Sequence, residues 1–246
     1  MDHMLYIGMA GARASQQAQT TLINNLANAS TAGFRADFHA LLSNEVAGPG
    51  HASRINPVSA ERYSQLTPGN VAQTGRDLDV AISGSGWLAV EDATGAEAYS
   101  RRGDLQLTAD GRLLNGAGQQ LLGDNGPVVI PPHGSMTIGQ DGTISIVPLG
   151  QGPNTLAVVD RLRLVTLDEQ QVIKGDDGLM RQRDGEPGQA SASVQLVSGA
   201  LEGSNVNAVA AMVDMINLSR TYEMQVKMMQ TAKDMADSGT RLMRLE

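Results

Sequence analysis

The sequence contains no cysteine and very few aromatic residues. None of its 246 residues is Cys, and only 3% are Phe, Trp or Tyr. The lack of cysteine excludes thiolate catalysis, structural disulfides and Cys-based zinc sites. With so few aromatic rings, the chain has no stacking platforms for bases and few for sugars. At this length it can still bury a real core without metal or disulfide support.

Positive charge is also scarce. The chain has 18 Lys and Arg against 26 Asp and Glu, a net charge of −8, and no basic cluster. Phosphate binding requires concentrated positive charge, so we expect no nucleic-acid partner. The sequence has no run of 18 apolar residues, which argues against membrane insertion through a spanning helix.

The first residues do not form a secretory signal peptide. Met1-Asp2-His3-Met4 is not a basic region followed by an apolar core. By ordinary routes we therefore expect the protein to stay in the cytoplasm. Any extracytoplasmic location would require an export system that reads an uncleaved N-terminus.

The residues that usually carry catalysis are scattered. The Asp-Gly pairs lack the alternating oxygen ligands of a calcium loop, and Ser83-Gly84-Ser85-Gly86 precedes a strand pattern and not the helix that a phosphate cradle needs. The four histidines show no i, i+4 pairing and no neighbouring nucleophile. We therefore expect no catalytic, cofactor or metal site, and no enzyme.

The C-terminal segment from 206 to 245 has the pattern of one long helix. Apolar or small residues recur there at steps of three and four, a period near 3.5. A helix capped by Ser204 or Asn205 and reaching Arg244 would be about 55 to 60 Å long. The stripe consists of Met212, Met215, Ser219, Tyr222, Val226, Met229, Lys233, Ala236, Thr240 and Met243. Val209, Val213 and Ile216 widen it in the first turns of the helix.

The N-terminal segment from 5 to 29 shows a weaker version of the same pattern. Its stripe contains two Gln residues and consists of Leu5, Met9, Ala12, Gln16, Gln19, Ile23 and Leu26. Such a helix should be marginal alone and become ordered when other helices complete its apolar face. The C-terminal helix is the obvious partner. The alternative is that both are ordinary amphipathic helices that dock on the central domain.

The middle of the chain is predicted to be all-β. Short segments alternate polar and apolar residues, and Asp-Gly or Asn-Gly pairs recur between them as turns. Before it, residues 36–75 are interrupted at Gly48-Pro49-Gly50, Asn56-Pro57 and Thr67-Pro68-Gly69. We interpret these residues as a linker or extended arm that neighbours keep in order.

The string Asn24-Asn25-Leu26-Ala27-Asn28-Ala29-Ser30-Thr31-Ala32-Gly33-Phe34-Arg35 indicates the end of a helix. Asn favours local backbone bonding, and Gly33 suits the left-handed position that stops a helix, after which Phe34 can pack back onto the last turn. Asn24, Asn25 and Asn28 also offer amide groups for lateral hydrogen bonds between subunits.

These residues resemble a known family. The string at 24–34 is similar to the signature of the bacterial flagellar rod and hook proteins, the axial proteins of the basal body. The resemblance extends through Gly86-Trp87-Leu88-Ala89-Val90, Tyr99-Ser100-Arg101-Arg102-Gly103-Asp104-Leu105 and Asp110-Gly111-Arg112-Leu113-Leu114. It continues in 120–131 and in Gly203-Ser204-Asn205-Val206-Asn207, Met212-Val213 and Ser219-Arg220-Thr221-Tyr222-Glu223, so it covers nearly the whole chain.

The resemblance implies a structural subunit of a hollow rod that crosses the periplasm and transmits torque from motor to hook in flagellum-dependent motility. The start of the chain and Val226-Lys227-Met228-Met229-Gln230-Thr231-Ala232 are most similar to proximal-rod members. Distal-rod members are the alternative. The implied partners are other rod subunits, the protein itself and the flagellar type III export apparatus, which would export the chain without signal cleavage.

The predicted fold is mixed: a discontinuous α-helical coiled-coil domain from both termini plus a central all-β domain rich in hairpins. Its parts are 1–35, the N-terminal helix; 36–75, the linker or arm; 76–203, the β domain; and 204–246, the C-terminal helix. The predicted subunit-assembly residues are Leu5, Met9, Ala12, Ile23, Asn24, Asn25, Leu26, Asn28, Gly33, Phe34, Asn205, Val206, Val209, Met212, Val213, Ile216, Tyr222, Val226 and Met229.

A function of another class stays open at this point. The β domain could bind glycans, with Trp87 and the Gly-rich loops lining the site and the helices merely dimerising the protein. Glycan binding usually uses an exposed aromatic face, so substitution of Trp87 and measurement of the affinity for saccharides would separate the two hypotheses.

Overall fold

A computed structural model of the chain describes residues 2–45, 55–150 and 155–243. It divides into two compact units, each assembled from separated stretches of sequence. Unit 1 comprises Met1–Ala29, Asp37–Gln65 and Val206–Glu246, and unit 2 comprises Ser30–Ala36 and Leu66–Asn205. The prediction of a mixed fold, with helices at both termini and a many-stranded β region between them, is confirmed.

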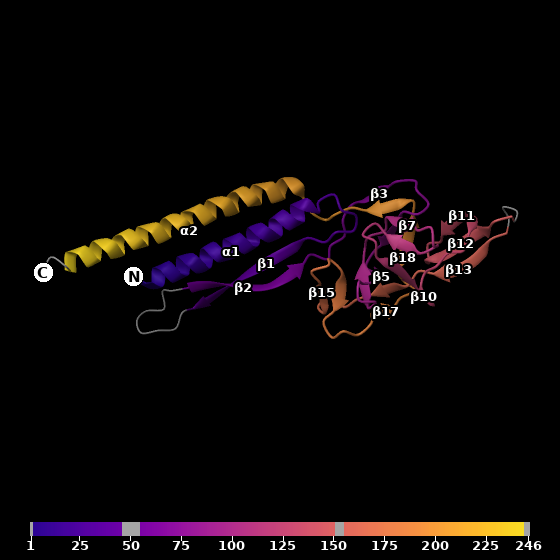
Figure 1. Cartoon of the computed structure of the whole chain (residues 1–246), viewed down its shortest axis with the longest axis horizontal. Helices are drawn as coiled ribbons and strands as arrows, with labels where there is room; N and C mark the ends of the chain where they lie inside the picture. Colours follow the sequence, from indigo (N-terminus) through magenta and orange to yellow (C-terminus); the bar gives the residue numbers. More distant parts are fainter. Residues whose placement is uncertain (1, 46–54, 151–154, 244–246) are drawn as a thin grey trace. The chain divides into compact units, whose positions relative to one another are not determined.

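Unit 1 contains two long helices and one β-hairpin. Helix α1 (Asp2–Ala27) packs against helix α2 (Ala208–Met243) and against strands β1 (Asp37–Glu45) and β2 (Ile55–Ser64). The two helices run antiparallel, so the start of α1 and the end of α2 lie at the same end of the pair (Figure 1). The predicted pairing of the terminal helices is therefore observed. Neither described helix is long and apolar enough to cross a membrane.

The interpretation of residues 36–75 as a linker or arm is wrong for its first part. Strands β1 and β2 pair antiparallel from Asp37↔Ser64 to Glu45↔Ile55. Because the sheet has only these two strands, Pro57 can occupy an edge without interrupting an inner ladder. Helix α1 packs against both strands of the hairpin. Because this contact comes from a segment outside 36–75, no local pattern in these residues predicted the hairpin. Gly48-Pro49-Gly50 lies outside the described residues.

The predicted N-cap of the C-terminal helix is displaced by two to three residues. The Oδ1 atom of Asn207 accepts hydrogen bonds from the backbone N–H groups of Val209 and Ala210, both at 3.1 Å. Asn207 therefore satisfies the first free donors of α2. Asn205 has another task, because its Oδ1 accepts from Ala36 N at 2.7 Å and its Nδ2 donates to Thr67 O at 3.1 Å.

Unit 2 is built from short strands, as predicted for the middle of the chain. They are β3 (Val71–Gln73), β4 (Val80–Ser83), β5 (Trp87–Glu91), β6 (Glu97–Ser100), β7 (Leu105–Leu107), β8 (Leu113–Asn115), β9 (Gln120–Gly123), β10 (Gly126–Pro127), β11 (His133–Ile138), β12 (Thr143–Pro148), β13 (Ala157–Arg161), β14 (Leu164–Thr166), β15 (Val172–Lys174), β16 (Met180–Gln182), β17 (Gln189–Ala190), β18 (Gln195–Ser198) and β19 (Ala200–Glu202).

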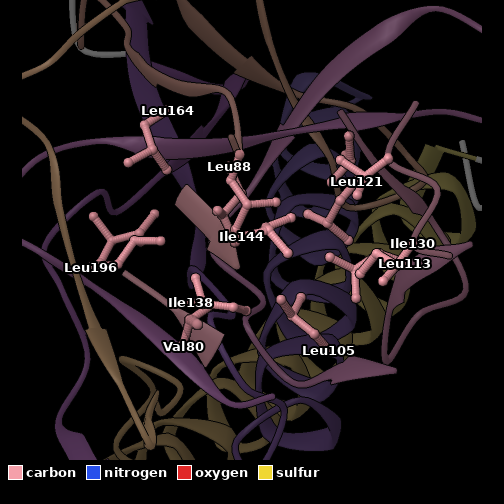
Figure 2. Close-up of a cluster of buried hydrophobic side chains, with 14 of the residues drawn as sticks. Val80, Leu88, Leu105, Leu113, Leu121, Ile130, Ile138, Ile144, Leu164 and Leu196 are labelled. Carbon is pink, nitrogen blue, oxygen red and sulfur yellow. The ribbon is translucent and has the colours of Figure 1, made fainter. Parts of the chain in front are cut away.

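The strands of unit 2 form one large sheet and several small ones. The main path runs β15-β16-β6-β5-β9-β8-β7, and β11-β12-β13 form a separate three-stranded sheet. Two-stranded pairs join β18 to β4 and β19 to β3. Aliphatic side chains from many of these strands meet in one buried core, in which Leu88, Leu121 and Ile144 are at most 1% exposed (Figure 2).

The hairpin turns follow the predicted pairs with one exception. Six such pairs lie in unit 2, and five of their glycines, Gly111, Gly126, Gly142, Gly178 and Gly185, have φ between +74° and +114°. In the remaining pair, Asn115-Gly116, the positive φ of 82° is at Gly118 instead. Asn115 explains the difference, because its Oδ1 accepts from the backbone of Ala117 and Gln119 and orders a longer turn.

Candidate assembly surfaces

Asn25 joins the end of α1 to the start of the hairpin. Its Nδ2 donates to Asp37 O at 2.7 Å and its Oδ1 accepts from Asp37 N at 2.9 Å. Asn25 is only 4% exposed. The prediction that Asn25 offers its amide to a neighbouring subunit is therefore wrong. Asn28 also bonds locally, because its Nδ2 donates to Asn24 O at 2.9 Å.

Gly33 does not stop α1, which already ends at Ala27. It has the predicted positive φ, 67°, but its role belongs to unit 2. Its backbone N donates to Glu202 O at 2.8 Å, and a Cβ at this position would lie 2.4 Å from the carbonyl carbon of Arg101. Glycine is required here by both conformation and space. The ring of the next residue, Phe34, lies 4.0 Å from Lys174 Nζ.

The Glu202 carboxylate binds three separate segments of unit 2. Arg35 Nη2 donates to its Oε1 at 2.5 Å, Arg101 Nη1 donates to its Oε2 at 2.9 Å, and Gly69 N donates to Oε1 at 2.8 Å. The three charged side chains are at most 4% exposed. Burial lowers the pKa of Arg35, whereas the nearby Glu202 charge opposes that shift. This cluster fixes the segments that follow α1 and precede α2 in the chain.

Sequence reasoning missed this cluster. Arg35 and Glu202 are separated by 167 positions, and no local pattern in a single sequence pairs residues so far apart. The one signal in the sequence was that both residues adjoin the predicted assembly segments. Arg35 directly follows Phe34, and Glu202 directly precedes Gly203-Ser204-Asn205.

Trp87 lies beside the same cluster and has little exposed surface. It is 6% exposed, and the guanidinium carbons of Arg101 and Arg35 lie 5.4 and 5.9 Å from its ring centroid. Such cation–π contacts hold the ring between charged neighbours. Because a sugar needs an open aromatic face, the alternative of a glycan site built on Trp87 is not supported.

The contact between α1 and α2 uses small residues. The buried face of α1 is formed by Gly8, Gly11, Ala12, Ala14 and Ser15. A Cβ at Gly8 would lie 2.8 Å from Met229 Cγ, and one at Gly11 would lie 2.8 Å from Gln225 Nε2. A side chain at either position would have to displace Met229 or Gln225, so the two glycines favour a close approach of the helices.

The buried stripe of α2 also differs from the predicted one. Its spacing of three and four residues is retained, but the stripe is rotated so that Ala211 and Ala232 are buried whereas Met212 and Val226 are exposed. The physical reason is that small residues let the two helices approach closely, so small size and not apolar bulk decides which side of α2 is buried. The inward stripe, in which Tyr222 is the most exposed, consists of Ala208, Ala211, Met215, Leu218, Tyr222, Gln225, Met229, Ala232 and Ala236.

The predicted assembly residues consequently fall into three groups. Ala12 and Asn25 are buried within unit 1. Partly buried residues are Leu5, Leu26, Asn28, Gly33, Phe34, Asn205, Val206 and Met229. Exposed residues are Met9, Ile23, Asn24, Val209, Met212, Val213, Ile216, Tyr222 and Val226.

Four exposed residues form one patch at the start of α2. Val209 is 74% exposed, and Met212, Val213 and Ile216 are 53 to 54% exposed. Their spacing of i, i+3, i+4 and i+7 places them on one side of the helix, away from the buried Ala211. We call these four residues the α2 patch. An apolar patch of this kind on a helix indicates a surface for a protein partner.

Unit 1 also contains a groove of about 310 Å³, to which α2 contributes residues adjacent in sequence to the α2 patch. It is lined by residues of α1, β1 and α2, including Leu22, Phe38 and Leu218. Phe38 is 52% exposed and stands opposite Tyr63, which is 55% exposed, in the β1–β2 hairpin. The groove and this aromatic pair add apolar surface that a packed neighbour could cover.

Comparison with known proteins agrees with this arrangement. Three family models match: "Flagella basal body rod protein" at residues 5–35, "Flagellar hook protein FlgE/F/G D1 domain" at 81–146 and "Flagellar basal body rod FlgEFG protein C-terminal" at 197–242. The chain is 41% identical to the flagellar basal-body rod protein FlgF of Escherichia coli and 40% identical to that of Salmonella typhimurium, each over 99% of both chains.

A rod protein with another designation is more distant. The identity to the flagellar basal-body rod protein FlgG of Buchnera aphidicola is 31%, over 97% of this chain and 98% of that protein. The matches cover both terminal helices and the β region between them. The chain therefore belongs to the flagellar basal-body rod protein family and is similar to FlgF.

Proposed function

We propose that this chain is a structural subunit of the proximal part of the flagellar basal-body rod, which associates with copies of itself and with other rod subunits through α1 and α2. The α2 patch carries the proposal. It presents four apolar side chains that unit 1 does not bury. The family is structural and not enzymatic, in agreement with the prediction from sequence.

The proximal position is supported by the relatives. The two relatives with 40 to 41% identity are both named FlgF, whereas further relatives named FlgF or FlgG are 27 to 32% identical. By resemblance, those named FlgF are proximal-rod and those named FlgG distal-rod proteins. A proximal subunit would lie in the periplasmic part of the basal body and carry torque toward the hook. It would arrive through the flagellar type III export apparatus.

A coiled-coil arrangement of the terminal helices is supported by their spacing. The inward stripe of α2 follows the three-and-four repeat of a heptad. Helix α1 packs against this stripe and not against the outward side of α2. The outward sides of both helices, including Met9 and Ile23 on α1, remain exposed. Neighbouring subunits would complete the packing, as in an inner layer of helices around a channel.

Assembly of the purified full-length chain tests the function. We expect Ile216→Asp to prevent sedimentable polymers at high protein concentration, because it places a charge within the α2 patch. Ala210→Asp is the matched control, since it adds the same charge to an exposed position of the same helix outside the α2 patch. Equal polymer yields from both variants would contradict the proposal.

The isolated monomer provides a second test. Because the helices bury only narrow stripes, we expect their amides in dilute solution to exchange with solvent faster than those of the unit 2 core. Protection of α1 and α2 equal to that of the core would show that the helices need no neighbours.

A further inference from the structure

The chain carries its sulfur in methionine alone. The sequence contains 12 methionines and no cysteine. Two of the methionines, Met136 and Met180, lie in unit 2, and the others lie in 1–9 and 212–243, which belong to unit 1. Because no thiol is present, the thioether of methionine is the sulfur group that peroxides can oxidise in this protein.

Exposure divides these methionines according to the unit in which they lie. In unit 2, Met136 is 7% and Met180 is 2% exposed, and each belongs to a hydrophobic core. On the helices of unit 1, Met9 is 56%, Met212 is 53% and Met224 is 63% exposed. An oxidant in solution therefore reaches sulfur atoms of the helices, whereas the β cores keep their own sulfur atoms covered.

Met212 differs from the other exposed methionines because it belongs to the α2 patch. Its neighbours there are Val209, Val213 and Ile216, and aliphatic side chains donate no hydrogen bonds. Oxidation to the sulfoxide adds a polar oxygen, which costs free energy when it is buried without a donor. Met224 lies outside both the α2 patch and the inward stripe of α2, so the same oxidation there leaves the patch apolar.

We propose that the sulfur of Met212 is a modification site for peroxides, and that its oxidation prevents a subunit from assembling. The inference rests on the proposed function, in which the α2 patch contacts neighbouring subunits. A lone pair of the sulfur attacks one oxygen of hydrogen peroxide, so an S–O bond forms while the O–O bond breaks. Sulfur loses two electrons to the peroxide. The leaving hydroxide takes the proton of the transferred hydroxyl group and departs as water.

The modification acts on the unassembled subunit. Neighbours that pack on the α2 patch also cover the sulfur of Met212, so copies that have already joined are protected. The change is reversible, because methionine sulfoxide reductases convert both epimers of the sulfoxide back to the thioether. The cores of unit 2 stay intact throughout, since Met136 and Met180 are buried. An oxidised copy is therefore withheld from assembly and remains folded.

Peptide mass spectrometry of sedimented fractions tests the proposal without any substitution. The dilute full-length chain is partly oxidised with hydrogen peroxide, freed of peroxide, concentrated and sedimented. We expect the sulfoxide of Met212 to be several-fold enriched in the supernatant over the pellet, and that of Met224 to be distributed evenly. An even distribution of both sulfoxides would overturn the proposal, and so would oxidation of Met136 as fast as that of Met212.

Two leucine variants provide the second test, because leucine removes the sulfur and keeps a similar apolar volume. The polymer yield of each chain after peroxide is compared with that of its own untreated sample. We expect a several-fold loss for the wild type and for the control Met224→Leu, but no loss for Met212→Leu. Methionine sulfoxide reductases should restore the yield of the wild type. Equal losses in the two variants would contradict the assignment to Met212.

The outcomes for the wild type separate this inference from the proposed function. Polymers that form equally well from untreated chains and from chains oxidised at Met212 refute the inference alone. A wild type that never sediments, with or without peroxide, refutes the proposed function and the inference together.

Discussion

Arg35 donates a 2.5 Å hydrogen bond to Glu202 across 167 positions of sequence, and both side chains are buried. Arg101 shares the same carboxylate, so one negative charge serves two guanidinium groups. Attraction in a buried site must offset the cost of removing three charges from water. The arrangement therefore depends on each of its members, and it holds the two chain segments that lead to the helices in one place.

Removal of the Glu202 charge should destabilise unit 2. In Glu202→Gln the two guanidinium groups lose their counter-charge in a buried site, so we expect a loss of about 3 kcal/mol in the free energy of unfolding. Chemical denaturation monitored by Trp87 fluorescence measures it, because the ring lies next to both arginines. The exposed Glu186→Gln is the control. A change below about 1 kcal/mol, as expected for surface charges, would show that the cluster contributes little.

Asn25→Ala should loosen the hairpin. The substitution leaves both main-chain groups of Asp37 without their partner, and each unsatisfied buried group costs about 1–3 kcal/mol. We expect faster hydrogen exchange throughout β1 and β2 while unit 2 keeps its protection. Asn24→Ala, at the adjacent exposed position, should leave the exchange unchanged. The role assigned to Asn25 is wrong if the two variants behave alike.

Gly8→Leu should separate the two helices. A Cβ at this position already lies 2.8 Å from Met229 Cγ, so a larger side chain forces α1 and α2 apart. Leucine favours helix formation over glycine by about 1 kcal/mol, and a net loss of stability would therefore be caused by packing. Circular dichroism during thermal unfolding measures it. Arg13→Leu, on the exposed side of α1, controls for added apolar bulk and should not reduce the helical signal.

Acid should weaken the contact between two hairpins of unit 2. Arg181 donates to both oxygens of Asp177, at 3.0 and 2.6 Å, and to Asp92 at 2.8 Å. The hydrogen bond from Arg181 lowers the pKa of Asp177, and a hydrogen bond from Thr94, followed by that of Arg181, lowers the pKa of Asp92. Because these folded-state pKa values lie below the unfolded value of about 3.9, the stabilisation is complete above that pH and is lost as the pH falls.

Arg181→Gln tests this pH dependence. We expect it to lower the stability only slightly at pH 7, since exposed ion pairs contribute little, and the difference from wild type should shrink toward pH 2. Urea unfolding at several pH values gives the comparison. The exposed Arg112→Gln should show no such trend. A difference that stays constant from pH 7 to pH 2 would exclude Asp177 and Asp92 as the cause.

The sequence by itself determined the class of fold and the family. The spacing of three and four in 208–243 and the recurrent Asp-Gly and Asn-Gly pairs are local properties of the backbone, so helix, turn and strand could be predicted from them. The motifs of the family occur in the same order at both ends and in the middle of the chain, and they were enough to predict that the chain belongs to it. Even so, the predicted seam was displaced, because Gly8 and Ala211 bury their faces through smallness and not through hydrophobic bulk.

Only the tertiary structure decided which residues are partners. Asn25 was expected to bind a neighbouring subunit and binds Asp37 instead, and Asn205 was expected to cap α2 but bonds to Ala36 and Thr67. Contacts between distant positions, such as the shared carboxylate of Glu202, arise when the chain ends return to one unit. Local preferences act over a few residues, whereas burial and charge pairing depend on the whole folded chain, and therefore these contacts had no signature in the sequence.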